Sequence, residues 1–481
     1  MFETPDLAPL ATEIFMLIMA CVVLVADLFV KDKERTLTYW LSQGALIGGF
    51  VITMMYSQFG GAPIVAYAGT FVVDDMAIVL KLAIFVIAFL ALLYSRPYIN
   101  NREILRGEYY MLVLFAVLGA SIMVSAHSLL TIYLGLELLS LSSYALVASY
   151  RDSRLASEAA IKYFVMGAMA SGFLLYGMSL IYGTTGSIDI AVIAESISAA
   201  PENNLLFAFG LVFIVCGLAF KLGAVPFHMW IPDVYQGAPT SVTAFISSVP
   251  KIAGFGMIMR LLTEAMPELQ SHWVMMLIIL SVLSMGLGNI TAIVQSNIKR
   301  LLAYSAIAHM GYFLLGIIAG TAEGYSASMF YILIYALTSM AGFGMIVFMS
   351  RAGFECDNLD DFKGLWQRSP WYALMMLMTI MSMAGVPPFI GFWPKLQVIM
   401  ALINADNGLM WLAITAMVFS IIGAFVYLRI AKVIFFDKPE VETPLEADMD
   451  MKIALSVNGL AMIGLGLFPG LILSYCIQVF S

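Results

Sequence analysis

Four ionisable side chains stand within long apolar runs of the sequence: Glu137, Lys221, Lys251 and Lys395. A charge at the centre of a bilayer costs roughly 2.5–3.5 kcal/mol on insertion scales, so each of these residues is a candidate functional residue. A carboxylate that moves towards or away from a buried lysine changes how tightly that lysine holds its proton. The residue types therefore predict proton transfer inside a membrane, with Glu137 switching Lys221 between holding and releasing a proton.

The composition that surrounds these charges is that of a membrane protein. Of 481 residues, 62% are hydrophobic and 11% are charged, with a mean hydropathy of +0.95. Soluble domains carry about 25% charged residues, which excludes a water-soluble enzyme. The net charge of −8 argues against a nucleic-acid partner. The four cysteines are scattered, so no zinc, iron–sulfur or disulfide framework is expected.

A spanning helix needs roughly 20 mainly apolar residues. That criterion predicts fourteen spans, centred near residues 20, 48, 85, 117, 138, 171, 214, 252, 284, 311, 338, 387, 421 and 464. The separators are too short to fold as soluble domains. The fold class predicted for residues 1–481 is therefore a single all-α polytopic membrane domain.

The basic residues predict the orientation. If the N-terminus lies outside, 17 of the 23 basic residues fall on one side of the membrane, against only Arg260 on the other. The 17 are Lys31, Lys33, Arg35, Arg96, Arg102, Arg106, Arg151, Arg154, Lys299, Arg300, Arg351, Lys363, Arg368, Arg429, Lys432, Lys438 and Lys452. The positive-inside rule places that side in the cytoplasm and both termini in the periplasm.

Local explanations account for some of the intramembrane charges. Lys81 follows an acidic pair near the outer end of its span, and snorkelling to the interface explains it. Lys162 follows Glu158 by four residues, the favourable spacing for a helical ion pair, so structure and function remain equal alternatives there. Glu137 has no local cation, and a purely structural spacer would leave it and the three central lysines unexplained.

Two proline-rich segments, AVPFHMW at 224–230 and GVPPFIGFW at 385–393, break predicted spans seven and twelve. The first break leaves Lys221 at the C-terminal end of a half-helix, where unpaired carbonyls favour a cation. Lys395 follows the second break, and His228 follows the first, where water can reach it. His309, near the middle of span ten, fits either a proton carrier or a hydrogen-bonded helix contact.

The two breaks also suggest an internal repeat. Their first prolines, Pro226 and Pro387, lie five spans apart. Because five is an odd number, a five-helix unit repeated in tandem has inverted topology, which is typical of transporters with discontinuous helices. The expected organisation is helices 1–3 at about 8–96, a first repeat at about 108–263, a second at about 272–436 and a last helix at about 452–476.

Four stretches carry a family resemblance: YLGLELLSLSSYALVAS, LAFKLGAVPFHMWIPDVYQGAPTSVTAFISSVPKIAGFGM, SNIKRLLAYSAIAHMGY and AGVPPFIGFWPK. They resemble the antiporter-like subunits of respiratory complex I, the proton-translocating NADH:quinone oxidoreductase, over essentially the whole chain. The segment YQGAPT, followed shortly by a PK pair, is similar to the N-type subunit among these antiporter-like subunits. The L type carries a long C-terminal lateral helix, and the M type has a glutamate where Lys395 stands.

The resemblance implies fourteen helices, an inverted pair of five-helix repeats and one proton path per subunit. It implies roles in proton translocation for Glu137, Lys221, Lys251 and Lys395. Accessory positions on the same path are implied for Lys162, His228, Lys299 and His309.

The resemblance also implies partners and cofactors. NADH, FMN, iron–sulfur clusters and quinone would bind other subunits of a hetero-oligomer in the bacterial inner membrane, and none would bind this chain. The alternative is a sodium or potassium/proton antiporter subunit of the related multisubunit family, which has no redox partner.

Overall fold

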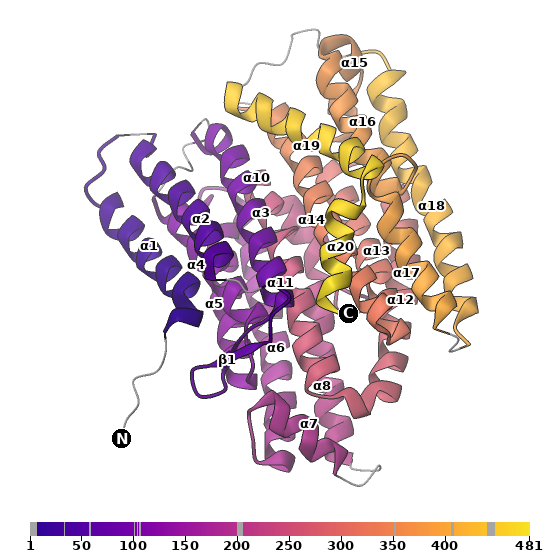
Figure 1. Cartoon of the computed structure of the whole chain (residues 1–481). Coiled ribbons are helices and arrows are strands. Elements are labelled where there is room, and N and C mark those ends of the chain that lie inside the picture. Colours follow the sequence, from indigo (N-terminus) through magenta and orange to yellow (C-terminus); the bar gives the residue numbers. More distant parts are fainter. Residues whose placement is uncertain are drawn as a thin grey trace.

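The computed structural model describes residues 7–32, 34–56, 59–100, 102, 104, 107–199, 205–350, 353–405, 408–439 and 448–481. Lys33, Arg106 and Arg351, which enter the orientation argument, lie outside the described residues. Long helices run side by side, with α1 (Ala11–Asp27) on one flank and α18 (Met410–Phe435) on the other, while the last two helices, α19 (Met449–Leu467) and α20 (Gly470–Val479), lie between them (Figure 1). Within the described ranges, a short hairpin of β1 (Ile64–Ala66) and β2 (Phe71–Val73), paired antiparallel, is the one sheet.

The helices up to the first break are α1 (Ala11–Asp27), α2 (Thr36–Tyr56), α3 (Asp75–Asn100), α4 (Gly107–Val124), α5 (Leu129–Val147), α6 (Arg154–Thr185), α7 (Ile190–Ser198) and α8 (Leu205–Leu222). Next come α9 (Trp230–Gly237), α10 (Thr240–Ile246), α11 (Val249–Ile258), a π-helical turn (Met259–Glu264), α12 (Gln270–Ile293), α13 (Ile298–Ala319) and α14 (Ala322–Met349). The chain ends with α15 (Leu365–Arg368), α16 (Pro370–Ala384), α17 (Phe392–Asn404), α18 (Met410–Phe435), α19 (Met449–Leu467) and α20 (Gly470–Val479). Short 3₁₀ turns occupy Ala8–Leu10, Pro267–Leu269 and Leu359–Phe362.

Polar residues at the helix starts define where several helices begin. Ser128, Ser153, Asn297 and Thr321 precede α5, α6, α13 and α14, and each side-chain oxygen accepts a hydrogen bond from the backbone N–H three residues on. Such caps satisfy donors that the first turn of a helix leaves unpaired. These boundaries therefore follow from local sequence.

Thirteen helical segments of the described chain are long and apolar enough to cross a membrane. They coincide with thirteen of the fourteen predicted spans. The remaining one, centred near residue 387, is divided into α16 and α17, each too short to qualify by itself. The all-helical membrane class is confirmed.

The predicted breaks are present, and there is a further one. α8 ends at Leu222 and α16 at Ala384, and the glycine that follows each end, Gly223 or Gly385, has a positive φ of +73° or +80°. Glycine adopts this left-handed conformation without strain, which suits it to end a helix. The span from residue 240 to 264 is also interrupted, because α10 ends at Ile246 and α11 begins at Val249.

The interpretation of Lys81 as a snorkelling side chain was wrong. Its side chain is 4% exposed, and its Nζ lies 2.6 Å from Glu13 Oε1 of α1. The ammonium also lies 4.9 Å from the ring centroid of Phe71. A buried counter-charge from α1 explains why α3 tolerates this lysine. Local spacing could not predict the pairing, because Glu13 and Lys81 are far apart in the sequence.

Arg260, the one basic residue expected on the outer side, is buried rather than exposed. Its Nη1 lies 2.7 Å from Asp74 and 2.6 Å from Glu264, and Nη2 donates to the Val124 carbonyl at 3.1 Å. Burial raises the pKa of the Asp74 carboxyl, but the Arg260 guanidinium outweighs burial, so that this pKa lies below its usual value. The cluster joins the segment before α3 to α4 and to the π-helical turn.

The Glu13–Lys81 pair yields a prediction about stability. Glu13→Gln removes the carboxylate that contacts the buried Lys81 ammonium, so the free energy of unfolding should fall by about 3–5 kcal/mol. The double variant Glu13→Gln/Lys81→Met should recover most of that loss. Thermal unfolding of the detergent-solubilised protein measures both.

The control is Asp437→Asn, which removes an ion pair whose Lys432 side chain is 68% exposed. It should change the free energy of unfolding by at most about 1 kcal/mol. Equal losses in the single and double Glu13 variants would contradict the account.

Candidate functional site

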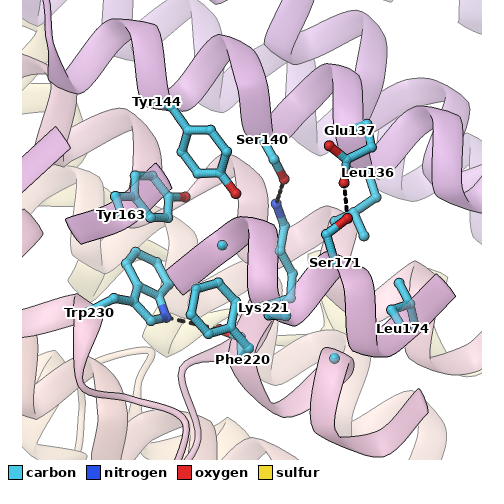
Figure 2. Close-up of a pocket in the computed structure, with 13 residues that line it drawn as sticks. Leu136, Glu137, Ser140, Tyr144, Tyr163, Ser171, Leu174, Phe220, Lys221 and Trp230 are labelled. Atoms are coloured by element: carbon cyan, nitrogen blue, oxygen red, sulfur yellow. Dashed lines mark hydrogen bonds between the residues drawn. The ribbon is translucent and has the colours of Figure 1, made fainter. Parts of the chain in front are cut away.

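The first cluster of the site lies between α5, α6 and α8. Ser171 donates a hydrogen bond to Glu137, and Lys221 Nζ donates to Ser140 Oγ at 3.1 Å (Figure 2). Glu137 and Lys221 both line one cavity of about 20 Å³. A cavity of more than roughly 10–15 Å³ holds a water molecule when polar partners are available. Glu137 and Lys221 therefore share a space that fits one bridging water.

Two lysines lie at the end of α8, the predicted Lys221 and Lys251 of a neighbouring helix. Lys221 occupies the last turn of α8, as expected, but its side chain turns to Ser140. The carbonyl of Leu222 instead accepts a hydrogen bond from Lys251 Nζ of α11 at 2.6 Å. Lys221 therefore lies at the end of the half-helix as predicted, and a lysine from a neighbouring helix donates to the last carbonyl of that half-helix.

Lys395 makes the corresponding contact at the second break. Its Nζ donates to the carbonyls of Ala384 at 2.8 Å and of Met383 at 3.1 Å, at the end of α16. Lys251 and Lys395 each lie over an aromatic ring as well, at 5.4 Å from Trp230 and 5.3 Å from Tyr312. Both breaks thus hold a buried ammonium group between freed carbonyls and an aromatic face, an arrangement that favours a cation.

His309 lies in a buried cluster of hydroxyl groups. Its Nδ1 lies 2.7 Å from Tyr331 Oη, and its Nε2 lies 3.0 Å from Tyr427 Oη. Tyr427 Oη is also 2.5 Å from Ser305 Oγ. The two direct partners of the His309 ring thus come from α14 and α18 and not from its own helix.

Hydroxyl groups also lie between the two halves of the chain. Ser339 Oγ of α14 donates to Ser247 Oγ at 2.9 Å, and Ser247 lies 3.4 Å from Ser248 Oγ, three residues before Lys251. One turn before Ser339, the ring of Tyr335 lies 5.4 Å from that of His309. Serine and tyrosine side chains therefore lead from the segment just before Lys251 to the ring of His309.

The accessory residues divide into two groups. Lys162 pairs with Glu158 at 3.0 Å, as predicted, and with Asp233 at 2.7 Å, while Arg300 reaches the same Asp233 at 2.8 Å. This cluster joins α6, α9 and α13.

Among the described residues, Lys299 and His228 form no hydrogen bond or ion pair with the three central lysines. Lys299 is buried at the start of α13 and pairs with Asp357 at 2.9 Å. His228 is half-buried between α8 and α9. Among the hydrogen bonds of the described residues, none joins the His228 ring to a lysine.

Several site residues were missed by reasoning from the sequence: Ser140, Ser171, Ser247, Ser339, Tyr331, Tyr427 and Asp233. Ser140 could have been predicted, because it lies three residues after Glu137 and so shares a helix face with it. The others contact their partners from different helices, which no local spacing reveals.

The cluster can hold and pass protons. Lysine, carboxylate and histidine exchange protons, and hydroxyl groups relay them because each can donate and accept. No group of three or more histidine, cysteine, aspartate or glutamate side chains among the described residues could hold a metal ion.

Comparison with known proteins gives consistent results. The family model NADH:quinone oxidoreductase/Mrp antiporter, TM, matches residues 126–421. NADH-quinone oxidoreductase subunit N of Thioalkalivibrio sulfidiphilus is 54% identical and covers 98% of each chain. A chain of respiratory complex I from Thermus thermophilus superposes with a TM-score of 0.80 at 31% identity, covering 96% of this chain and 98% of that one. A chain of the Mrp complex from Dietzia shares the fold, with a TM-score of 0.84 at 22% identity, covering 98% of this chain and 96% of that one.

The fold and its two lysine-capped helix breaks define a multi-spanning membrane protein of the antiporter-like class. Within that class, the identity over nearly the full length is decisive: the chain belongs to the NADH-quinone oxidoreductase subunit N family.

The His309 cluster yields a prediction about stability. Tyr427→Phe keeps the ring but removes the hydroxyl that lies between His309 and Ser305, so buried polar atoms lose a partner. The free energy of unfolding should fall by about 1–3 kcal/mol, measured by thermal unfolding of the purified protein.

Tyr372→Phe is the matched control, since Tyr372 of α16 lies outside this cluster and its ring centroid is 4.4 Å from that of Phe348. Its effect should be much smaller, and equal effects of the two substitutions would contradict the assigned contacts.

Proposed function

We propose that this chain is the membrane-arm subunit through which NADH-quinone oxidoreductase translocates protons, driven by redox chemistry in other subunits. The observation that carries the proposal is the pair of buried ammonium groups, Lys251 and Lys395, held on carbonyls that the helix breaks leave free. A lysine held only by hydrogen-bond acceptors can lose its proton without breaking an ion pair. Family membership supports the same activity.

The path begins with Glu137 and Lys221, which face one water-sized cavity. A shift of the carboxylate towards Lys221 stabilises the protonated amine, and a shift away promotes release of the proton towards Lys251. Ser247, Ser339 and His309 relay protons to Lys395 in the second half. Lys162, Lys299 and His228 act as accessory groups that connect this line of residues to the membrane surfaces.

The proposal includes the finer architecture. α16 and α17 together form the twelfth of fourteen crossings, and two five-helix repeats of inverted topology span about 108–263 and 272–436. Helices at about 8–96 and 452–476 flank them within a single transmembrane domain. Both termini then lie on the periplasmic side of the bacterial inner membrane, which follows from the distribution of basic residues.

The partners are the other membrane subunits of the enzyme and the surrounding lipid. NADH, FMN, iron–sulfur clusters and quinone bind other subunits, and this chain supplies only proton-carrying side chains.

A cation/proton antiporter subunit is the second candidate, because the matching family model covers both protein classes. The likeness to the Mrp chain, at 22% identity, concerns the fold, whereas 54% identity supports the oxidoreductase subunit. Purification in mild detergent discriminates between them. Copurifying flavin and iron–sulfur signals support the oxidoreductase, and sodium-dependent proton flux in vesicles without NADH or quinone supports the antiporter.

Lys221→Ala tests the proton path. The substitution removes the amine beside Glu137 but leaves the helix intact, so we expect assembly at the wild-type level and loss of most NADH-driven proton translocation in inverted membrane vesicles. Loss by roughly tenfold or more is expected when a positioned proton carrier is removed.

Lys432→Ala serves as the control, since this lysine of α18 is 68% exposed. Its proton translocation should match the wild type. Wild-type translocation by the Lys221→Ala variant at normal assembly would contradict the proposal.

A further inference from the structure

A carboxylate outside the predicted path lies at the junction of three helices. Glu355 belongs to the loop after α14, and its carboxylate accepts hydrogen bonds from Tyr98 of α3 at 2.9 and 3.0 Å and from Thr240 at the start of α10. Arg102 Nη2 lies 2.7 Å from the same carboxylate. Glu355 thus connects α3 and α10 to the loop that follows α14.

One side of this carboxylate faces solvent, and the other faces buried polar groups. The Glu355 side chain is 25% exposed, whereas that of Lys299, 3.8 Å away, is 4% exposed. Arg102 and Lys299 belong to the basic side of the membrane, which the proposed function places in the cytoplasm. Glu355 therefore lies where it contacts both cytoplasmic water and the protein interior.

Buried hydroxyl groups lead inwards from Glu355. Thr240, Thr243, Ser247 and Lys251 follow one another at intervals of three, four and four residues, and all are at most 1% exposed. Thr240 and Thr243 lie one turn apart on α10, Ser247 lies in the interruption after it, and Lys251 lies in the first turn of α11. Eleven residues rise about 16 Å at 1.5 Å per residue. That distance is about half of the roughly 30 Å hydrocarbon core, so the row ends at mid-membrane depth.

The helix is interrupted where this row reaches Lys251. Pro250 has no N–H, so it cannot donate to the carbonyl of Ile246, and the gap between α10 and α11 falls at Ser247 and Ser248. Backbone carbonyls freed inside a membrane protein are tolerated where they line a polar or water-filled space. The interruption therefore provides acceptors at the point where Ser339 of α14 also donates to Ser247.

A second buried hydroxyl supports a hydrated space beside the row. Tyr235 is fully buried, and its Oη has no hydrogen-bond partner among the described residues. The centroid of its ring lies 5.7 Å from that of Phe343 of α14, which is one helical turn from Ser339. The backbone carbonyl of Tyr235 accepts a hydrogen bond from Thr243 Oγ1 at 3.1 Å. Buried hydroxyl groups without a protein partner are commonly satisfied by ordered water.

We propose that Glu355 collects protons from the cytoplasm and delivers them to Lys251 along the hydroxyl row Thr240, Thr243 and Ser247. The carboxylate takes a proton from water and gives it to the row. Each hydroxyl or bridging water then accepts one proton as it donates another, and the neutral amine of Lys251 takes the last. The inference rests on the proposed function and adds a proton-collecting residue and a route for uptake.

The test uses the assembled oxidoreductase in inverted membrane vesicles. Glu355→Gln keeps the size of the side chain and an acceptor oxygen but cannot take up a proton. NADH-driven proton translocation should fall about tenfold or more, and Glu355→Asp should restore part of it. Asp360→Asn is the control, since that carboxylate of the same loop region is 68% exposed and pairs with Lys363. It should pump at the wild-type rate.

Substitutions within the row distinguish proton delivery from a merely structural contact. Thr243→Val and Ser247→Ala should also lower proton translocation at normal assembly. Thr379→Val should not, because the buried Thr379 of α16 bonds only its own helix backbone at Met375. If Glu355→Gln prevents assembly, Thr243→Val decides the question, because Ser247 also belongs to the relay of the proposed function.

The inference and the proposed function can fail separately. Normal translocation by Glu355→Gln, or by both row variants, would overturn the inference even where Lys221→Ala blocks translocation. Normal translocation by Lys221→Ala as well would overturn the proposed function itself.

Discussion

The structure depends on how a membrane protein satisfies backbone carbonyls where a helix is broken. Water is excluded from the hydrocarbon core, so each freed carbonyl needs a donor from the protein or from water held in a polar cavity of the protein. At the two main breaks, the donor is the ammonium group of Lys251 or of Lys395. Each contact offsets two costs together, since the carbonyl gains a donor and the cation gains acceptors without a counter-ion.

The two halves solve this problem differently. In the second half, Lys395 belongs to the same broken span as the carbonyls that it binds. In the first half, Lys251 comes from a neighbouring helix, which frees Lys221 to turn towards Ser140 and the cavity that it shares with Glu137. The first half therefore contains one lysine that can respond to a carboxylate and another that stabilises the break.

The sequence was sufficient for the spans and for the main breaks, because hydrophobic length and the steric effect of proline act locally. Glu137 and the three central lysines could be identified from the sequence as well, because few other charged residues occur in the apolar runs. Contacts between distant segments were not predictable: Glu13 beside Lys81, Tyr427 beside His309, and Lys251 at the end of α8 all depend on how helices pack. The interruption at Ser247 and Ser248 lay within reach of sequence reasoning, as Pro250 follows directly.

The central claim is that buried lysines, hydroxyls and His309 form one hydrated proton path across both halves of the chain. A density map of the assembled oxidoreductase, at a resolution that shows ordered water, tests it most directly. The account predicts water molecules that connect Lys221 to Lys251 and the Ser247–Ser339 contact to His309. A dry, close-packed junction between Lys251 and His309 in every state of the enzyme would contradict it.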